Sequence, residues 1–178
     1  MQLQWSHAVI YVRNLEAMLE FYCKTLGFEV TDRGPIAESG PEIIFLSQIP
    51  NDHHQLAMIT TRKDDAPSNS VNHFAFRTQA FDDLKSLAKS LDDIGGIKIN
   101  PLSHGNTLSI YFNDPEQNGI EVFWDTPWHV AQPQGKPWDL SLDDTQALEW
   151  VKKEFSDEPG FQPRENYYKQ RAIEMGKL

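Results

Sequence analysis

Two histidines and one glutamate have the residue types and surroundings expected of metal ligands. His7 and His73 stand at matching places in two similar segments, SHAV and NHFA. Glu121 lies in an otherwise apolar run, where a carboxylate is costly to bury unless a cation or a metal pairs with it. Two His and one carboxylate form the facial ligand set of non-haem Fe(II), which leaves up to three coordination positions open. Each histidine alone is also compatible with a core or strand-edge residue, so only the combination indicates a metal site.

A second group of polar residues could supply acid–base chemistry. The stretch PNDHHQLAMI, residues 50–59, contains adjacent histidines, and an imidazole exchanges protons near neutral pH. Strict alternation back from Ala57 would turn His53, rather than His54, to the face that a site would use. In the segment 107–112 the even-numbered residues are apolar, which sends Tyr111 to the opposite face together with Thr107 and Ser109.

These residues must be positioned by a regular series of elements. A mostly apolar run over 4–12 predicts a strand buried on both faces. Asn14 caps the helix that follows, whose apolar residues recur at spacings of three and four until Gly27 stops it. Turn residues then separate three short strands, over 28–31, 42–47 and 56–61.

The same βαβββ order returns in the second part of the chain. A strand over 71–77 precedes a helix that starts near Phe81 and ends at Gly95-Gly96, and three strands follow over 97–100, 107–112 and 120–124. A repeat of this kind normally means that each unit must pair with the other to bury its hydrophobic face. The predicted fold class is α+β, with two paired βαβββ modules, about 1–64 and 68–128, forming one domain with a cup-shaped mixed β-sheet. Pairing of the two first strands would bring both imidazoles near Glu121.

The remaining segment, 129–178, is predicted to be a C-terminal extension of an arm and helices. The stretch PWHVAQPQGKPW is rich in Pro, Gln and Trp and reads as an ordered arm laid over the domain. Ser141 is predicted to cap a helix carrying Ala147, Leu148, Val151 and Phe155, and a last helix is expected over 165–175. This extension could be a lid, a dimer contact or a core cover.

Composition narrows the class of protein. With 178 residues, 39% of them hydrophobic, the chain is long enough for one domain with a real core. Cys23 is the only cysteine, so a disulfide within the chain and a thiolate-rich metal site are excluded. The net charge of −10 would repel nucleic acid. No apolar run suggests a membrane span, and the N-terminus lacks the features of a signal peptide, so a cytoplasmic location is expected.

The segments HAVIYVRNLEAMLEFYCKTLGFEV and NDPEQNGIEVFWD, together with the repeated βαβββ plan, resemble the vicinal-oxygen-chelate superfamily. This superfamily includes glyoxalase I, fosfomycin-resistance proteins, methylmalonyl-CoA epimerase and the type I extradiol ring-cleaving dioxygenases. The resemblance covers roughly residues 3–128. It implies that the metal ligands are His7, His73 and Glu121. Glyoxalase I has a carboxylate at the position of Ala57, so the resemblance favours an open site with three ligands.

Further residues resemble the extradiol dioxygenases within that superfamily. Their HHxxA-like sequence matches His53 to Ala57, which implies that His54 is the active-site acid/base. Their Tyr ten residues before the Glu ligand matches Tyr111, and their His-x-Asn sequence upstream of that Tyr matches His104. The implied catalytic residues are therefore His54, Tyr111 and His104.

The resemblance implies an extradiol dioxygenase that opens the ring of a catechol-type diol with O₂ at Fe(II), with Mn(II) as the alternative metal. The expected partners are a small aromatic diol and O₂, with no nucleic acid and no membrane, and the chain is expected to form a homo-oligomer. Two alternatives remain open. One is another metal-dependent enzyme of the superfamily, of glyoxalase, epimerase or thiol transferase type, and the other is a protein of this fold that only binds an aromatic ligand.

Overall fold

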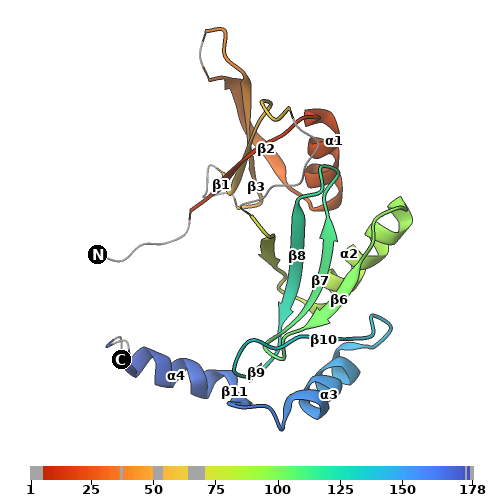
Figure 1. Cartoon of the computed structure of the whole chain (residues 1–178), viewed down its shortest axis with the longest axis vertical. Coiled ribbons are helices and arrows are strands. Elements are labelled where there is room, and N and C mark those ends of the chain that lie inside the picture. Colours follow the sequence, from red (N-terminus) through yellow and green to blue (C-terminus); the bar gives the residue numbers. More distant parts are fainter. Residues whose placement is uncertain (1–5, 37, 50–53, 64–70, 175, 177–178) are drawn as a thin grey trace. The chain divides into compact units, whose positions relative to one another are not determined.

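The computed structural model describes residues 6–36, 38–49, 54–63, 71–174 and 176, and it confirms the predicted α+β class (Figure 1). The chain divides into two compact units. The first comprises Met1–Asn72 and Asn113–Asn118, and the second comprises His73–Phe112 and Gly119–Leu178. Each unit is described on its own below.

The first unit is a four-stranded sheet with one helical segment, in the strand order β1-β4-β3-β2. β1 runs parallel to β4, and the other pairs are antiparallel. Its elements are β1 (Ala8–Tyr11), α1 (Leu15–Leu19), a π-helical segment (Glu20–Thr25), β2 (Glu29–Pro35), β3 (Glu42–Ser47) and β4 (Leu56–Ile59). The predicted βαβββ order of this part of the chain is confirmed.

The first helix begins and ends where the sequence predicts, but its second half is not α-helical. The Asn14 side chain accepts a hydrogen bond from the Ala17 amide, and Gly27 follows the helix with a φ of 76°. Between these ends the chain widens into the π-helical segment, where the Leu26 amide donates to the Phe21 carbonyl. The wider turn lets the consecutive residues Phe21 and Tyr22 both enter the core, which a regular α-helical spacing does not predict.

β1 differs from its prediction as a strand buried on both faces. It lies at the edge of the sheet, with β4 as its partner, and its residues alternate between half-buried and exposed. Val9 is 47% and Tyr11 63% exposed. The apolar character of the run therefore does not reflect burial of both faces within the first unit.

The loop between β7 and β8, residues 113–118, belongs to the first unit and carries two buried carboxylates, Asp114 and Glu116. Glu116 is 2% exposed, and its Oε1 accepts hydrogen bonds of 2.6 Å from the amides of Arg13 and Asn14. Asp114 accepts a 3.2 Å hydrogen bond from the Tyr22 hydroxyl. Burial raises the pKa of both Asp114 and Tyr22. These bonds tie the loop to the start of α1 and to the π-helical segment.

The second unit is a five-stranded sheet, in the order β10-β6-β7-β8-β5, with helices and a small separate ribbon of β9 and β11. β5 runs parallel to β8. Its elements are β5 (Phe74–Arg77), α2 (Phe81–Ile94), β6 (Asn100–Ser103), β7 (Thr107–Asn113), β8 (Gly119–Asp125), β9 (Trp128–His129), β10 (Lys136–Pro137), α3 (Asp144–Phe155), β11 (Gln162–Pro163) and α4 (Arg164–Glu174).

The alternation predicted for β7 is confirmed, because Leu108, Ile110 and Phe112 are buried. The predicted strand over 97–100 is wrong: β6 starts only at Asn100, which lies opposite Tyr111, and it includes Pro101. Pro101 has no backbone N–H to donate, so its presence in the sequence argues against a strand. In the structure Pro101 nevertheless lies within β6, opposite Ile110 of β7.

The segment after β8 forms part of the sheet rather than only covering it. β10 pairs antiparallel with β6, with Lys136 opposite Ser103. The indole Nε1 of Trp138 donates a 2.9 Å hydrogen bond to the Ser109 carbonyl. α3 is capped by Asp143 and not, as predicted, by Ser141, because the Asp143 carboxylate accepts from the Gln146 amide and the Gln146 side chain accepts from the Asp143 amide.

None of the helices in the described ranges is long and apolar enough to cross a membrane.

Candidate active site

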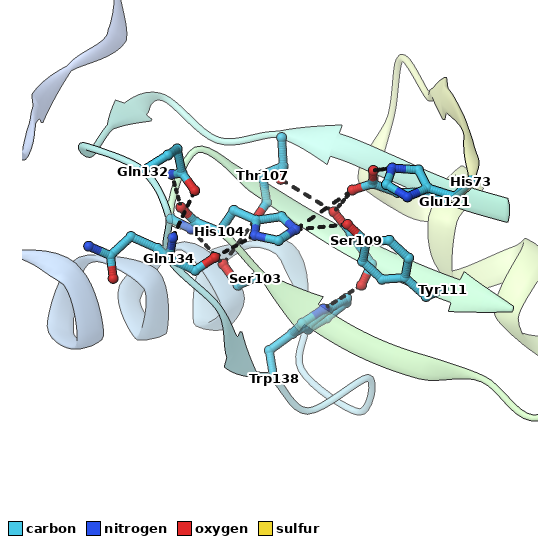
Figure 2. Close-up of polar contacts among 11 residues, drawn as sticks. His73, Ser103, His104, Thr107, Ser109, Tyr111, Glu121, Gln132, Gln134 and Trp138 are labelled. Carbon is cyan, nitrogen blue, oxygen red and sulfur yellow. Dashed lines mark hydrogen bonds and ion pairs between the residues drawn. The ribbon is translucent and has the colours of Figure 1, made fainter. Parts of the chain in front are cut away.

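A buried carboxylate and an imidazole face each other at one edge of the second unit's sheet. His73 directly precedes β5, and Glu121 lies in the neighbouring strand β8, opposite Ala75. The His73 Nε2 is 3.2 Å from the Glu121 Oε2 (Figure 2). Glu121 is 8% exposed, whereas the His73 side chain is 33% exposed. The pair therefore offers one nitrogen and one carboxylate oxygen that is largely shielded from solvent.

Ser109 completes the hydrogen bonding of this carboxylate. Its hydroxyl on β7 donates a 2.7 Å hydrogen bond to the Glu121 Oε1. Ser109 is itself fully buried, so the bond forms out of water and fixes the carboxylate orientation. The two oxygens of Glu121 are thus engaged by different residues, Oε1 by Ser109 and Oε2 by His73.

His104 and Tyr111 extend the cluster along β7. His104 lies in the turn between β6 and β7, and its Nε2 is 2.8 Å from the Tyr111 hydroxyl and 4.0 Å from the Glu121 Oε1. The Tyr111 ring also meets the His73 ring edge to face, with 5.5 Å between their centroids. Figure 2 shows the four side chains of His73, His104, Tyr111 and Glu121 converging.

The Tyr111 hydroxyl is held in its neutral form. Burial is the largest cause that raises its pKa, followed by hydrogen bonding to the Glu121 carboxylate and by the negative charge of that group. A hydroxyl with a raised pKa keeps its hydrogen at neutral pH. Tyr111 is therefore suited to hydrogen bonding and not to acting as a phenolate.

The first unit brings together the other two histidines singled out in the sequence. The rings of His7 and His54 are 4.2 Å apart, centroid to centroid, and His54 also contacts the Phe45 ring at 4.9 Å. The Ser6 hydroxyl lies 3.0 Å from the His7 Nδ1. His53 lies outside the described residues. Ala57, at the position where the sequence comparison places a carboxylate in glyoxalase I, is buried in β4.

Across the described ranges, no group of three or more His, Cys, Asp or Glu side chains is close enough to hold a metal ion. His73 and Glu121 are the two expected ligands that lie together in one unit, and His7 belongs to the other unit. Their donors are an imidazole nitrogen and a carboxylate oxygen, a combination that suits Fe(II) and Mn(II). The Glu121 carboxylate also meets the requirement that a metal ligand be oriented by a hydrogen-bonding neighbour, which here is Ser109.

Sequence reasoning did not single out Ser109 or the contacts made by the segment after β8. For Ser109 a signal was present, since alternation sends it to the same face as Tyr111. The segment after β8 gave no such signal. Its Gln134 carbonyl lies 2.6 Å from the His104 Nδ1, and its Gln132 side chain donates to the His104 carbonyl at 2.8 Å.

Comparison with known proteins points to one superfamily. The family model that matches residues 4–122 is described as the Glyoxalase/Bleomycin resistance protein/Dioxygenase superfamily. Among relatives, the biphenyl-2,3-diol 1,2-dioxygenase 2 of Rhodococcus globerulus is 27% identical over 67% of this chain and 61% of its own length. The catechol-2,3-dioxygenase of Bacillus subtilis (strain 168) is 30% identical over 68% of this chain and 41% of its own. The chain thus spans only about half the length of these relatives.

Solved structures share the fold. The fosfomycin resistance protein FosX of Listeria monocytogenes, in complex with Mn(II) and sulfate, has a TM-score of 0.55 and 19% identity, covering 71% of this chain and 95% of that one. The trypanothione-dependent glyoxalase I of Leishmania major has a TM-score of 0.53 and 20% identity, covering 68% and 86% of the two chains. The match of the family model over two thirds of the sequence, with this agreement in fold, shows that the chain belongs to the glyoxalase/bleomycin resistance protein/dioxygenase superfamily.

Proposed function

We propose that the protein is a metal-dependent extradiol dioxygenase that opens the ring of a catechol-type aromatic diol with O₂. The observation that carries the proposal is the cluster of His73, Ser109, His104 and Tyr111 around the buried Glu121 carboxylate. The named relatives that act on biphenyl-2,3-diol and catechol support the same reaction class. Isomerisation of the glyoxalase type is disfavoured because buried Ala57 supplies no fourth ligand.

The metal would be held by His7, His73 and Glu121. Fe(II), or Mn(II) in its place, supplies open positions at which the two vicinal oxygens of a diol and O₂ can bind together. Ser109 keeps the Glu121 carboxylate turned toward this position by holding Oε1, which leaves Oε2 on the side of His73.

The remaining residues would handle protons and orientation. His54 takes a proton from one hydroxyl of the diol and later returns one, a task for which imidazole is suited near neutral pH. Tyr111 hydrogen-bonds an oxygen of the diol, and His104 orients Tyr111 through their 2.8 Å contact. The product would be a ring-opened semialdehyde or keto acid.

We infer further that the chain works as a homo-oligomer in the cytoplasm. Each repeat carries part of the expected ligand set, His7 in the first unit and His73 with Glu121 in the second, so pairing of repeats is needed for a complete site. Such pairing can occur within one chain or between two. Sedimentation equilibrium of the wild type measures the number of chains directly.

The test combines metal analysis with oxygen uptake. The protein is loaded with Fe(II) without air and incubated with a panel of catechols, and air is then admitted. We expect oxygen uptake together with a yellow ring-opened product, and loss of both in Glu121→Gln, because an amide is a much weaker metal ligand than a carboxylate.

Two results would contradict the proposal. Metal binding without oxygen uptake on any diol would indicate another metal-dependent enzyme of the superfamily. An absence of metal binding, with retention of a catechol, would indicate a binding protein. Glu42→Gln is the matched control, because Glu42 pairs with Arg33 on the exposed surface of the first unit.

A further inference from the structure

The turn that carries His104 is held in place by residues 129–138, which we call the C-terminal arm. On one side, β10 of the arm pairs with β6 directly before the turn, with Lys136 opposite Ser103. On the other side, Val130 of the arm packs against Gly105, where an added Cβ would come within 2.5 Å of the Val130 Cγ1. The arm therefore fixes the backbone on which the His104 ring is mounted.

The arm also determines which nitrogen of His104 carries a hydrogen. The His104 Nδ1 lies 2.6 Å from the backbone carbonyl oxygen of Gln134. A carbonyl oxygen only accepts hydrogen bonds, so Nδ1 must be the protonated nitrogen. In the neutral ring Nε2 then has no hydrogen and is an acceptor, and it is this atom that lies 2.8 Å from the Tyr111 hydroxyl.

One side chain of the arm connects both partners of this bond. The Gln132 Oε1 accepts a 3.0 Å hydrogen bond from the Gln134 amide. The Gln132 Nε2 donates a 2.8 Å hydrogen bond to the His104 carbonyl. The side-chain amide of Gln132 thus holds the Gln134 backbone and the His104 backbone at a fixed separation (Figure 2).

The tautomer of His104 determines how Tyr111 can bond, because Tyr111 has a single hydroxyl hydrogen. The bare Nε2 of His104 lies 2.8 Å from that hydroxyl and accepts its hydrogen. The hydrogen is thereby kept within the protein. The Tyr111 oxygen is then left with lone pairs only, so it can accept a hydrogen bond from a ligand but has none to donate.

We propose that the C-terminal arm is a positioning element of the site: by holding His104 in the Nδ1–H form, Gln132 and the Gln134 carbonyl make Tyr111 an acceptor for a substrate hydroxyl. This inference rests on the proposed function. According to this inference, the diol hydroxyl next to Tyr111 stays protonated when the diol binds. The proton that His54 removes then comes from the second hydroxyl of the diol.

The first measurement is the tautomer of His104, which requires no turnover. Long-range ¹H–¹⁵N spectra of the full chain labelled with ¹⁵N-histidine distinguish protonated from bare ring nitrogens, and the His104→Gln spectrum assigns the signals. We expect Nδ1–H in the wild type. In Gln132→Met, which removes the hydrogen bonds of the Gln132 side-chain amide to His104, Val130 and Gln134, we expect a mixture of the two tautomers. Gln48→Met is the matched control, because Gln48 also donates a side-chain hydrogen bond to a backbone carbonyl, that of Leu26, but lies in the first unit, and it should keep the wild-type pattern.

The second measurement is turnover of the Fe(II)-loaded protein. We expect kcat to fall about tenfold in Gln132→Met with an unchanged Fe(II) affinity, which is the lower end of the roughly 10- to 100-fold loss seen when the hydrogen-bonding partner of a metal-bound residue is removed. Gln48→Met should turn over like the wild type. A purely structural role for Gln132 would lower the urea midpoint without altering the tautomer.

An Nε2–H tautomer in the wild type would overturn the proposal, and so would a Gln132→Met variant that stays fully in the Nδ1–H form. If instead the proposed function is wrong, the wild type takes up no oxygen with any catechol. The difference in His104 tautomer between the wild type and Gln132→Met would still be observed in that case.

Discussion

At the scale of single residues, the site depends on how one carboxylate is satisfied. Glu121 lies in an apolar strand, and its partners are a neutral hydroxyl and an imidazole, with no lysine or arginine among the contacts in the described part of the chain. A buried carboxylate is costly unless a cation or a metal pairs with it. The divalent cation that we propose would stabilise Glu121 in this position.

Replacing Ser109 should weaken metal binding more than it weakens the fold. Ser109→Ala removes the 2.7 Å hydrogen bond to Glu121, and the freed carboxylate loses its fixed orientation. We expect the Mn(II) affinity, measured by calorimetry, to fall roughly 10- to 100-fold, as for other residues that orient a metal ligand. Ser47→Ala is the control, because Ser47 is also a buried serine but lies in β3 of the first unit. Equal affinities for the wild type and Ser109→Ala would show that Ser109 does not orient Glu121.

His54 should matter for turnover and not for metal binding. Its ring lies against those of His7 and Phe45, and as the proposed acid/base it touches the substrate and not the metal. We expect His54→Gln to lower kcat by roughly 10²- to 10⁴-fold, the usual contribution of general acid–base catalysis, with the bound iron content unchanged. His53→Gln is the control. The opposite pattern, with His53→Gln inactive and His54→Gln active, would assign the role to His53.

The types of the candidate residues could be predicted from the sequence, but their bonding partners could not. Alternation along β7 identifies the face that carries Ser109 and Tyr111. It does not reveal that Ser109 reaches Glu121, because that distance depends on the register between β7 and β8. Likewise, the Gln134 partner of His104 is a backbone carbonyl, which every residue has, so no side-chain pattern could indicate it.

At the scale of elements, the segment after β8 determines the geometry of the turn between β6 and β7. Within that turn the Ser103 hydroxyl donates to the Thr107 carbonyl and accepts from the Gly105 amide. The Asn106 side chain accepts from the Val130 amide, and the Thr126 hydroxyl donates to the Gly105 carbonyl. The turn is therefore bonded both internally and to the chain that follows β8.

Gly105 should be the most sensitive glycine of this region. It has a φ of 76°, and an added Cβ would lie 2.5 Å from Val130 and 3.1 Å from Phe155. We expect Gly105→Ala to lower the free energy of unfolding by about 2–4 kcal/mol, from the cost of the left-handed backbone together with overpacking.

Gly96→Ala provides the matched control for Gly105→Ala. Gly96 has a φ of 74° but nothing within 4 Å of its added Cβ, so it reports the backbone cost alone, roughly 1–2 kcal/mol. Urea unfolding measures both variants. An equal loss in the free energy of unfolding for the two variants would show that Val130 and Phe155 move aside. The arm would then not hold the turn in place.

Most elements of the two repeats could be predicted, and the exceptions have physical causes. Apolar spacing and terminal residues identified α2 and β7 closely, since Gly95 and the alternation of β7 are local signals. The π-helical widening at Glu20–Thr25 was missed because it results from packing both Phe21 and Tyr22. β10 was missed because it has two residues, one of them a proline, and exists only through its partner β6.

At the scale of the whole molecule, the chain passes from the second unit into the first at Asn113 and returns at Gly119. The two strands on either side of this loop, β7 and β8, carry Tyr111 and Glu121. The loop itself is anchored in the first unit by Glu116, whose Oε2 also lies 3.6 Å from the Arg13 Nε and 3.7 Å from the Arg62 Nη1. The strands that bear the site are thus joined by a segment that belongs to the first unit.

Glu116→Gln should therefore destabilise the fold strongly. The substitution removes a negative charge that lies beside Arg13 and Arg62, at a position that is 2% exposed. Breaking a buried charge pair typically costs about 3–5 kcal/mol, and we expect a loss of about 3 kcal/mol in the free energy of unfolding measured in urea. Glu42→Gln, which breaks the exposed pair with Arg33, should lose less than about 1 kcal/mol. Similar losses for both variants would mean that Glu116 is not a structural anchor.

The two-residue strand β10 also has a consequence for anyone who shortens this chain. It covers the outer edge of β6 with a lysine and a proline, and such short strands prevent other chains from adding to a sheet, because proline offers no amide and lysine resists burial. A chain cut near residue 122, where the family match stops, would leave the edge of β6 without its partner strand. It would also lose the hydrogen bond from Trp138 to the Ser109 carbonyl in β7. We therefore expect a chain cut there to aggregate more readily than the full chain, because the edge of β6 would be free to pair with another chain.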